Sequence, residues 1–160
     1  MDLSPFEAAG ALLPGMLPSG LGEVRHYAHK YGIKVWFDAE KATKEHYEAQ
    51  VVGAKDVPDA KVLAIEVGFH AEHKAAERNE ETLARLLESE KAWRKVLGPE
   101  PDTGPFLGNQ KNWRRVSEVW DHAGLTDDAS VEAAERLADY IKVLEPLRLK
   151  ARKRAPRQSP

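Results

Sequence analysis

Residues 61–70 read KVLAIEVGFH, and this stretch decides which fold class the chain can adopt. Four apolar residues alternate along it with smaller or polar ones: Leu63, Ile65, Val67 and Phe69. Because successive side chains of a β-strand point to opposite faces, the alternation predicts a strand that buries one face. A charged segment with helical spacing follows over residues 79–97; Asn79 is a suitable N-cap and Gly98-Pro99 ends the helix. This succession predicts an α+β fold.

Further segments show the same two periodicities. Strands are predicted over residues 33–38, 46–52 and 112–120, and helices over about 20–31 and 130–145. The expected order of elements is therefore α-β-β-β-α-β-α. Short connections favour antiparallel pairing, so we expect a two-layer sandwich with a four-stranded, mainly antiparallel sheet and the helices packed on one face.

The chain is expected to form one domain with an arm and a tail. Prolines interrupt residues 1–19, which we expect as an irregular N-terminal arm with at most one turn of helix around residues 5–13, and residues 20–146 are the predicted single α+β domain. Pro146 is expected to end or kink the last helix, and residues 147–160 are expected as a flexible basic tail. The triplet Asp102-Thr-Gly104 lies between two prolines and is expected as a turn.

The composition excludes several classes of protein. There is no cysteine, which excludes a disulfide framework, a thiolate metal site and a cysteine nucleophile, and favours a reducing compartment. The apolar runs are far shorter than the roughly 20 residues that cross a bilayer, and the N-terminus lacks the basic start of a signal peptide. We therefore expect a cytoplasmic protein with no membrane partner and no cofactor.

One face of the predicted sheet collects polar and titratable side chains. If the apolar residues of each strand face the helices, the outward set is Trp36, Asp38, His46, Glu48, Gln50, Glu66, His70 and, from the last strand, Arg115. For that last strand two phases remain open, because either Arg115 and Ser117 or Arg114 and Glu118 point outward. Three interpretations compete for this face: a solvated surface, a ligand or partner surface, and a metal or catalytic centre.

No complete metal or catalytic motif is present in the sequence. His70 and His73 are three residues apart, but no H-E-x-x-H accompanies them, and an acid-x-Lys pair of the nuclease type is missing after Glu66. We therefore predict no metal site and retain only His70, His73 and Glu66 as weak ligand candidates.

The charge distribution suggests a separate hypothesis for the C-terminus. Residues 147–160 hold six basic residues and no acid: Arg148, Lys150, Arg152, Lys153, Arg154 and Arg157. Such a segment could contact nucleic-acid phosphates. Since the net charge is −2, however, the rest of the chain carries −8 and would repel nucleic acid.

The sequence thus favours a small binding or interaction domain that uses the polar sheet face or its rim to hold a ligand or a protein partner. A metal-assisted hydrolase or nuclease on the same face is the first alternative. A nucleic-acid-associated accessory protein acting through the tail is the second. No family's motifs can be placed on the chain residue by residue.

Overall fold

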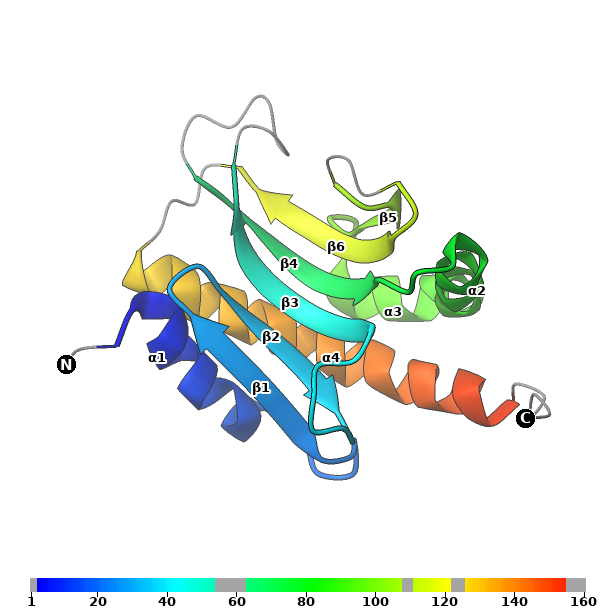
Figure 1. Cartoon of the computed structure of the whole chain (residues 1–160), viewed down its shortest axis with the longest axis horizontal. Coiled ribbons are helices and arrows are strands. Elements are labelled where there is room, and N and C mark those ends of the chain that lie inside the picture. Colours follow the sequence, from blue (N-terminus) through cyan, green and yellow to red (C-terminus); the bar gives the residue numbers. More distant parts are fainter. Residues whose placement is uncertain (1–2, 54–62, 108–110, 122–125, 155–160) are drawn as a thin grey trace.

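A single antiparallel sheet of six strands, in the order β1-β2-β3-β4-β6-β5, dominates the structure (Figure 1). The structure is a computed structural model; it describes residues 3–53, 63–107, 111–121 and 126–154, with side chains to residue 150. The strands are β1 (Val24–His29), β2 (Gly32–Phe37), β3 (Glu45–Val52), β4 (Ala64–Ala71), β5 (Asp102–Pro105) and β6 (Arg114–Trp120). The helices are α1 (Pro5–Leu12), the 3-10 helix η1 (Leu13–Met16), α2 (Ala76–Leu87), α3 (Glu90–Leu97) and α4 (Asp127–Arg154).

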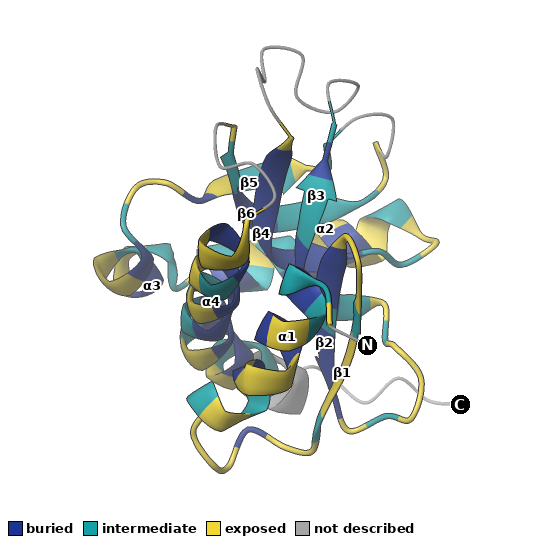
Figure 2. Cartoon of the chain, turned by 90° about the vertical axis from the view of Figure 1, so that its left-hand side faces the viewer, coloured by how far each residue is buried: buried dark blue, intermediate teal, exposed yellow. Residues whose placement is uncertain are grey.

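The hydrophobic core lies between one face of the sheet and the helices. Helices α1 and α4 contact each other and lie together on the same side of the strands (Figure 2), while α2 and α3 pack against α4. The sheet contributes alternate residues to this core: Ile33, Val35, Phe37, Tyr47, Ala49, Ile65, Val67, Phe69 and Val116. The alternation predicted for β2, β3 and β4 thus has the phase read from the sequence. Among the described helices, none is both long and apolar enough to cross a bilayer.

The α+β class and the antiparallel sheet are confirmed, and the four expected strands are present as β2, β3, β4 and β6. The expected number of strands and order of elements are wrong, because the sheet also contains β1 and β5. Residues 24–29, predicted within a helix, form β1, which pairs with β2 through a two-residue turn. Val24 and Ala28 are four residues apart, and because four is an even number, a strand also places them on one face. The stretch expected as a turn is the edge strand β5, which pairs with β6.

The single helix predicted over residues 79–97 is instead two helices, because the helical conformation is interrupted between Leu87 and Glu90. The break shifts the apolar stripe, so Val96 is 63% exposed although the continuous helix placed it inward. Leu63 precedes β4 and is 47% exposed, whereas the sequence placed it in the core.

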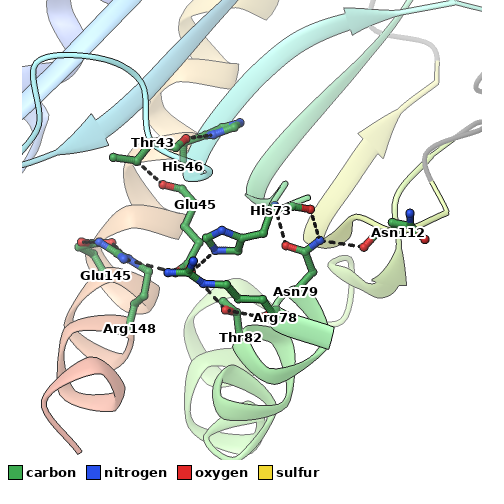
Figure 3. Close-up of polar contacts among 10 residues, drawn as sticks. All are labelled: Thr43, Glu45, His46, His73, Arg78, Asn79, Thr82, Asn112, Glu145 and Arg148. Carbon is green, nitrogen blue, oxygen red and sulfur yellow. Dashed lines mark hydrogen bonds and ion pairs between the residues drawn. The ribbon is translucent and has the colours of Figure 1, made fainter. Parts of the chain in front are cut away.

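Asn79 is not the N-cap of a helix. It lies within α2 and is buried, and its side chain hydrogen-bonds to two other segments of the chain. Its side-chain oxygen accepts from the backbone N–H of His73, and its amide donates to the carbonyls of His73 and Asn112 at 2.8–2.9 Å (Figure 3). One side chain thereby joins the segment after β4 to the segment before β6.

Both terminal segments contain more structure than expected. Within residues 1–19, which we expected to be irregular, Ser4 caps α1 and the buried Phe6 and Leu13 join the core. Helix α4 continues through Pro146 to Arg154 rather than ending at the proline. Leu147, beyond the proline, packs against the core. These contacts stabilise the helix past the break that proline would otherwise favour.

A polar network anchors the last turns of α4 to β3 (Figure 3). Arg148 donates to both carboxylate oxygens of Glu145, at 2.9 and 2.6 Å, and lies 3.3 Å from Glu45. The hydroxyl of Tyr47 donates to the same buried Glu145 at 2.8 Å. Arg148 therefore belongs to the folded body and not to a free tail.

The core assignment predicts that Ile65→Ala lowers the free energy of unfolding by about 2–5 kcal/mol, from lost burial and the cavity left behind. The exposed Val96→Ala is the matched control and should change it by less than about 0.5 kcal/mol. Urea unfolding monitored by circular dichroism measures both. Equal unfolding midpoints in the two variants would contradict the assigned core.

Because Arg148 anchors α4, we predict that substitutions of two basic residues in this helix differ in their effect on stability. Arg148→Met leaves the buried Glu145 carboxylate without its cation and should cost about 3 kcal/mol. Lys150→Met removes an exposed charge two residues later and should have little effect. If thermal unfolding shows the two variants to be equally stable, then Arg148 does not anchor α4.

Candidate metal centre

Two histidines face each other across the central strands on the polar face, the sheet face opposite the helices. His46 of β3 and His70 of β4 are direct cross-strand partners, with ring centroids 5.6 Å apart. Glu48 and Glu72 each follow one of these histidines by two residues, and the alternation of strand side chains puts them on the same face. The N–H of Glu72 donates to the carbonyl of Lys44 at 2.8 Å, so the pairing extends past the end of β4.

The four side chains point at one spot, and we call them the His–Glu cluster. Nε2 of His46 lies 3.3 Å from Glu48 Oε1 and 3.4 Å from Glu72 Oε2. Nδ1 of His70 lies 3.5 Å from the same oxygen of Glu48 and 3.3 Å from that of Glu72. One donor atom from each residue lies within 4.8 Å of the other three. Each imidazole nitrogen therefore faces both carboxylates at nearly equal distances.

Hydrogen bonds on the far side of each ring determine where its proton lies. Nδ1 of His46 is 2.7 Å from the carbonyl oxygen of Thr43, which only accepts, so Nδ1 is the donor (Figure 3). Nε2 of His70 is 2.7 Å from a carboxylate oxygen of Glu66 and is likewise the donor. In the neutral rings the other two nitrogens are bare, and these are the nitrogens that face the carboxylates.

A bare nitrogen opposite a carboxylate oxygen is a repulsive contact between two lone pairs. Both Nε2 of His46 and Nδ1 of His70 are buried, and no described residue makes a hydrogen bond of good geometry to either. Such a site needs protons on both rings or one cation between the four groups. A single metal ion would satisfy all of these contacts at once.

The electrostatics of the His–Glu cluster favour positive charge. Burial lowers the pKa of His46 and His70, but the surrounding carboxylates raise it by more, so both lie above the usual range. Burial raises the pKa of Glu48 and Glu72, and the nearby imidazoles lower it by more, so both lie well below the usual range. The cluster is therefore built from ionised carboxylates that attract a cation.

The polar face is covered over its centre, so it is not the solvated surface that was one of the three interpretations of the sequence. His46, Glu66 and His70 are buried, and the ring of Phe106 packs edge-on against His70 with centroids 4.6 Å apart. Trp113 packs against Phe106 in turn. The side chains of Glu48 and Glu72 remain 14% and 15% exposed, so the cluster opens to solvent on their side.

The other sequence candidates take different positions around this cluster. Glu66 holds His70 with one carboxylate oxygen and accepts from Gln50 Nε2 at 2.9 Å with the other, so it lies behind the ring and outside the cluster. Asp38 is also outside, because its carboxylate accepts from the backbone N–H of Glu23 at 2.7 Å. Trp36 is buried, and its indole donates to the carbonyl of Ala39.

The last strand resolves the phase that the sequence left open. Arg115 is the cross-strand partner of His70, and it donates to the hydroxyl of Ser117 at 2.9 Å, so these two residues share the polar face. Glu118 lies on the helix side, where it accepts from the hydroxyl of Tyr140 at 2.7 Å.

His73 belongs to a second network, on the side of α2 and α4. Its Nε2 lies 2.6 Å from Glu45, which also accepts from Thr82 at 3.2 Å and meets Arg148 (Figure 3). Glu45 and His46 are neighbours in sequence, but strand alternation directs them to opposite faces. His73 is therefore separated from His70 by the sheet itself.

Of the basic residues considered for nucleic acid, only two have described side chains. Arg148 is engaged in the ion pairs with Glu145 and Glu45, and Lys150 is exposed. The side chains of Arg152, Lys153 and Arg154 and the whole of Arg157 lie outside the described residues. The nucleic-acid hypothesis remains a prediction.

Sequence reasoning missed Glu72, although a signal for it was present. The spacing His46-Tyr-Glu48 recurs as His70-Ala-Glu72, and the period of two that groups Glu66 with His70 extends to position 72. The strand was expected to end at His70, which removed Glu72 from the face.

A pocket of about 380 Å³ adjoins the His–Glu cluster. It lies over β1, β2 and the segment after β2, and Glu48 is part of both its wall and the cluster. Its aromatic and charged lining residues are Tyr27, His29, Lys34, Trp36, Glu40, Lys41 and Glu48.

Comparison with known proteins gives no assignment. A scan against protein-family models finds no match to this chain, and searches of curated proteins and of solved structures return none either. Any functional assignment therefore rests on the geometry of the chain itself.

Gly68 separates Glu66 from His70 on the polar face and predicts a steric test of this geometry. A Cβ at this position would lie 2.3 Å from the carbonyl oxygen of Val116 and 2.6 Å from the Cα of Ser117, so β4 and β6 would have to move apart. Gly68→Ala should cost about 1–3 kcal/mol of stability. Gly53→Ala is the control, because a Cβ there meets no atom of the described residues within 4 Å. Equal melting temperatures for the two variants would contradict the close approach.

Proposed function

We propose that this protein is a metal-binding domain that holds one divalent transition-metal ion at the His–Glu cluster of His46, Glu48, His70 and Glu72. The observation that carries the proposal is the pair of buried imidazole nitrogens without hydrogen-bond partners, each 3.3–3.5 Å from both carboxylates. A metal ion between the four groups would take the place of the protons that these nitrogens otherwise need and form coordination bonds with all four side chains.

The donor set selects a class of metal. Two imidazoles with two carboxylates and no thiolate suit Zn²⁺ and neighbouring transition metals, while Mg²⁺ and Ca²⁺ prefer all-oxygen sites. Zinc bonds of about 2.0–2.2 Å place tetrahedral ligands about 3.3–3.6 Å apart. The four histidine–glutamate separations of 3.3–3.5 Å lie in this range. The donor set and these four separations are compatible with zinc and with neighbouring transition metals.

The outer partners support the same conclusion. Metal-ligating histidines almost always donate their second N–H to a carbonyl or carboxylate, which orients the ring and increases its basicity. Thr43 performs this role for His46 with its carbonyl, and Glu66 performs it for His70 with its carboxylate. The charge balance agrees, since Glu48, Glu66 and Glu72 carry three negative charges around two rings that are neutral when they bind metal.

The number of donors favours binding over catalysis. Structural zinc sites are closed by four protein ligands, whereas catalytic sites keep one position open for water or substrate. Four side chains of this protein converge on one spot. We therefore propose that the bound ion stabilises the fold or takes part in binding a ligand, and that it does not catalyse a reaction.

A metal-assisted hydrolase is the second candidate, and the position of Glu48 is the observation that favours it. Glu48 borders the pocket and is partly exposed. If it left the metal, His46, His70 and Glu72 would remain as the two-histidine, one-glutamate set found in catalytic zinc sites, with Glu48 free to act as a base. Asp38, an acid considered for this role, lies outside the cluster.

Metal addition to the purified chain tests the proposal. At a Zn²⁺ concentration 100 times Kd, mass action stabilises the fold by about 2.7 kcal/mol, which should raise Tm by about 5–10 °C. Mg²⁺ at the same concentration should have no comparable effect. Glu72→Gln should weaken zinc binding at least about 100-fold, and Glu66→Gln, which removes an outer partner, about 10–100-fold. Calorimetric titration measures the affinities.

His26→Gln is the matched control, because His26 is exposed on β1 away from the cluster and its loss should leave zinc binding unchanged. A melting temperature that does not respond to Zn²⁺, Co²⁺ or Mn²⁺ would overturn the proposal. So would a zinc response that persists in Glu72→Gln and disappears in His26→Gln, since the ion would then bind adventitiously to the surface.

A further inference from the structure

We infer that the pocket beside the His–Glu cluster binds a small organic anion with a planar ring, of the class of aromatic carboxylates, and that bound metal makes it competent to do so. The inference rests on the proposed metal function and adds to it the class of ligand. It depends on Glu48, the residue that the pocket and the cluster share.

The pocket has the size of a small-molecule site. Its volume of about 380 Å³ lies near the lower end of the range of about 300–1,000 Å³ that is usual for such sites. Tyr27 of β1 and Lys34 of β2 are cross-strand partners, and so are Lys34 and Glu48. These three side chains therefore form one row that leads from the edge of the sheet to the His–Glu cluster.

Aromatic side chains provide a planar, apolar wall. Trp36 is held in place by the hydrogen bond from its indole to the carbonyl of Ala39, at 2.9 Å, and it is nearly fully buried. Tyr27 and His29 line the same pocket, and their rings lie 5.7 Å apart. Flat rings such as these stack on a flat ligand, which distinguishes an aromatic acid from a compact anion such as phosphate.

The cations of the pocket become available when metal binds. Nζ of Lys34 lies 3.8 Å from Oε1 of Glu48, the oxygen that also faces both histidines. Coordination to a metal ion draws the charge of Glu48 toward the metal and weakens its hold on Lys34. A ligand carboxylate can then pair with this ammonium.

The charged residues that line the pocket also favour anion binding once a metal ion is bound. Without metal, Lys34 and Lys41 are matched in the pocket by Glu40 and Glu48. A divalent ion that coordinates Glu48 offsets the charge of this carboxylate, which leaves Lys34 and Lys41 matched in the pocket lining by Glu40 alone. The metal and the anion should therefore each increase the affinity of the other, as thermodynamic linkage requires.

Titration calorimetry with benzoate tests the inference on the full chain, with and without Zn²⁺. Zinc affinity is measured first in the same sample, and zinc retention is checked after the benzoate titration. The zinc-loaded protein should bind benzoate at least tenfold more tightly than the metal-free protein. The neutral analogue benzamide and inorganic phosphate should each bind at least tenfold more weakly than benzoate, because one lacks the charge and the other the ring.

Two lysine variants separate the pocket from the metal site. Lys34→Gln should weaken benzoate binding to the zinc-loaded protein at least tenfold without weakening zinc binding, because it removes a cation that competes with the metal for Glu48. Lys95→Gln, an exposed lysine on α3, should change neither. Benzoate binding that is equal with and without zinc, or unaffected by Lys34→Gln, would overturn this inference while the metal site stands. A failure to bind zinc would overturn the proposed function first and this inference with it.

Discussion

The pairing of β3 with β4 in a register that sets His46 opposite His70 is the constraint on which the candidate site depends. A shift of β4 by one residue would send His70 to the core face and bring Phe69 to the polar face. The core prevents this shift, because Ile65, Val67 and Phe69 are buried against the helices only in the observed register. The packing of the apolar face therefore determines which side chains of β3 and β4 lie together on the polar face.

The candidate site contains ionisable side chains in a buried strand, where an unpaired charge destabilises the fold. Strand β4 is central and buried along its whole length, yet Glu66 and His70 lie within it. Unpaired buried charges are strongly destabilising, so every member of such a group requires a partner. Glu66 and His70 partner each other, and the nitrogen of His70 that faces Glu48 and Glu72 obtains one when a metal ion is bound. On the proposed function, metal binding and folding would be coupled in this protein.

A second polar network, behind the sheet, holds α4 in place over β3. Arg148, Glu145 and Tyr47 join the end of the helix to the strand that carries His46 and Glu48. Because adjacent residues of β3 serve the two networks on opposite faces, the position of α4 and the geometry of the His–Glu cluster depend on the same strand. The basic residue that anchors the helix lies in a segment whose composition alone suggests a free tail.

The alternation of residues in β2, β3 and β4 could be read from the sequence, and it determined which side chains share the polar face, including His46, Glu48 and His70. The sequence did not determine β1, whose spacing fits both a helix and a strand, or the burial of the polar face. Burial was decided by the tertiary structure, because Phe106, far from β4 along the chain, covers His70. The orientation of the two rings toward one point was likewise decided by partners that only the fold brings together. The local periodicity of a strand predicts on which face of the sheet a side chain lies, but it does not predict which residues pack against that side chain.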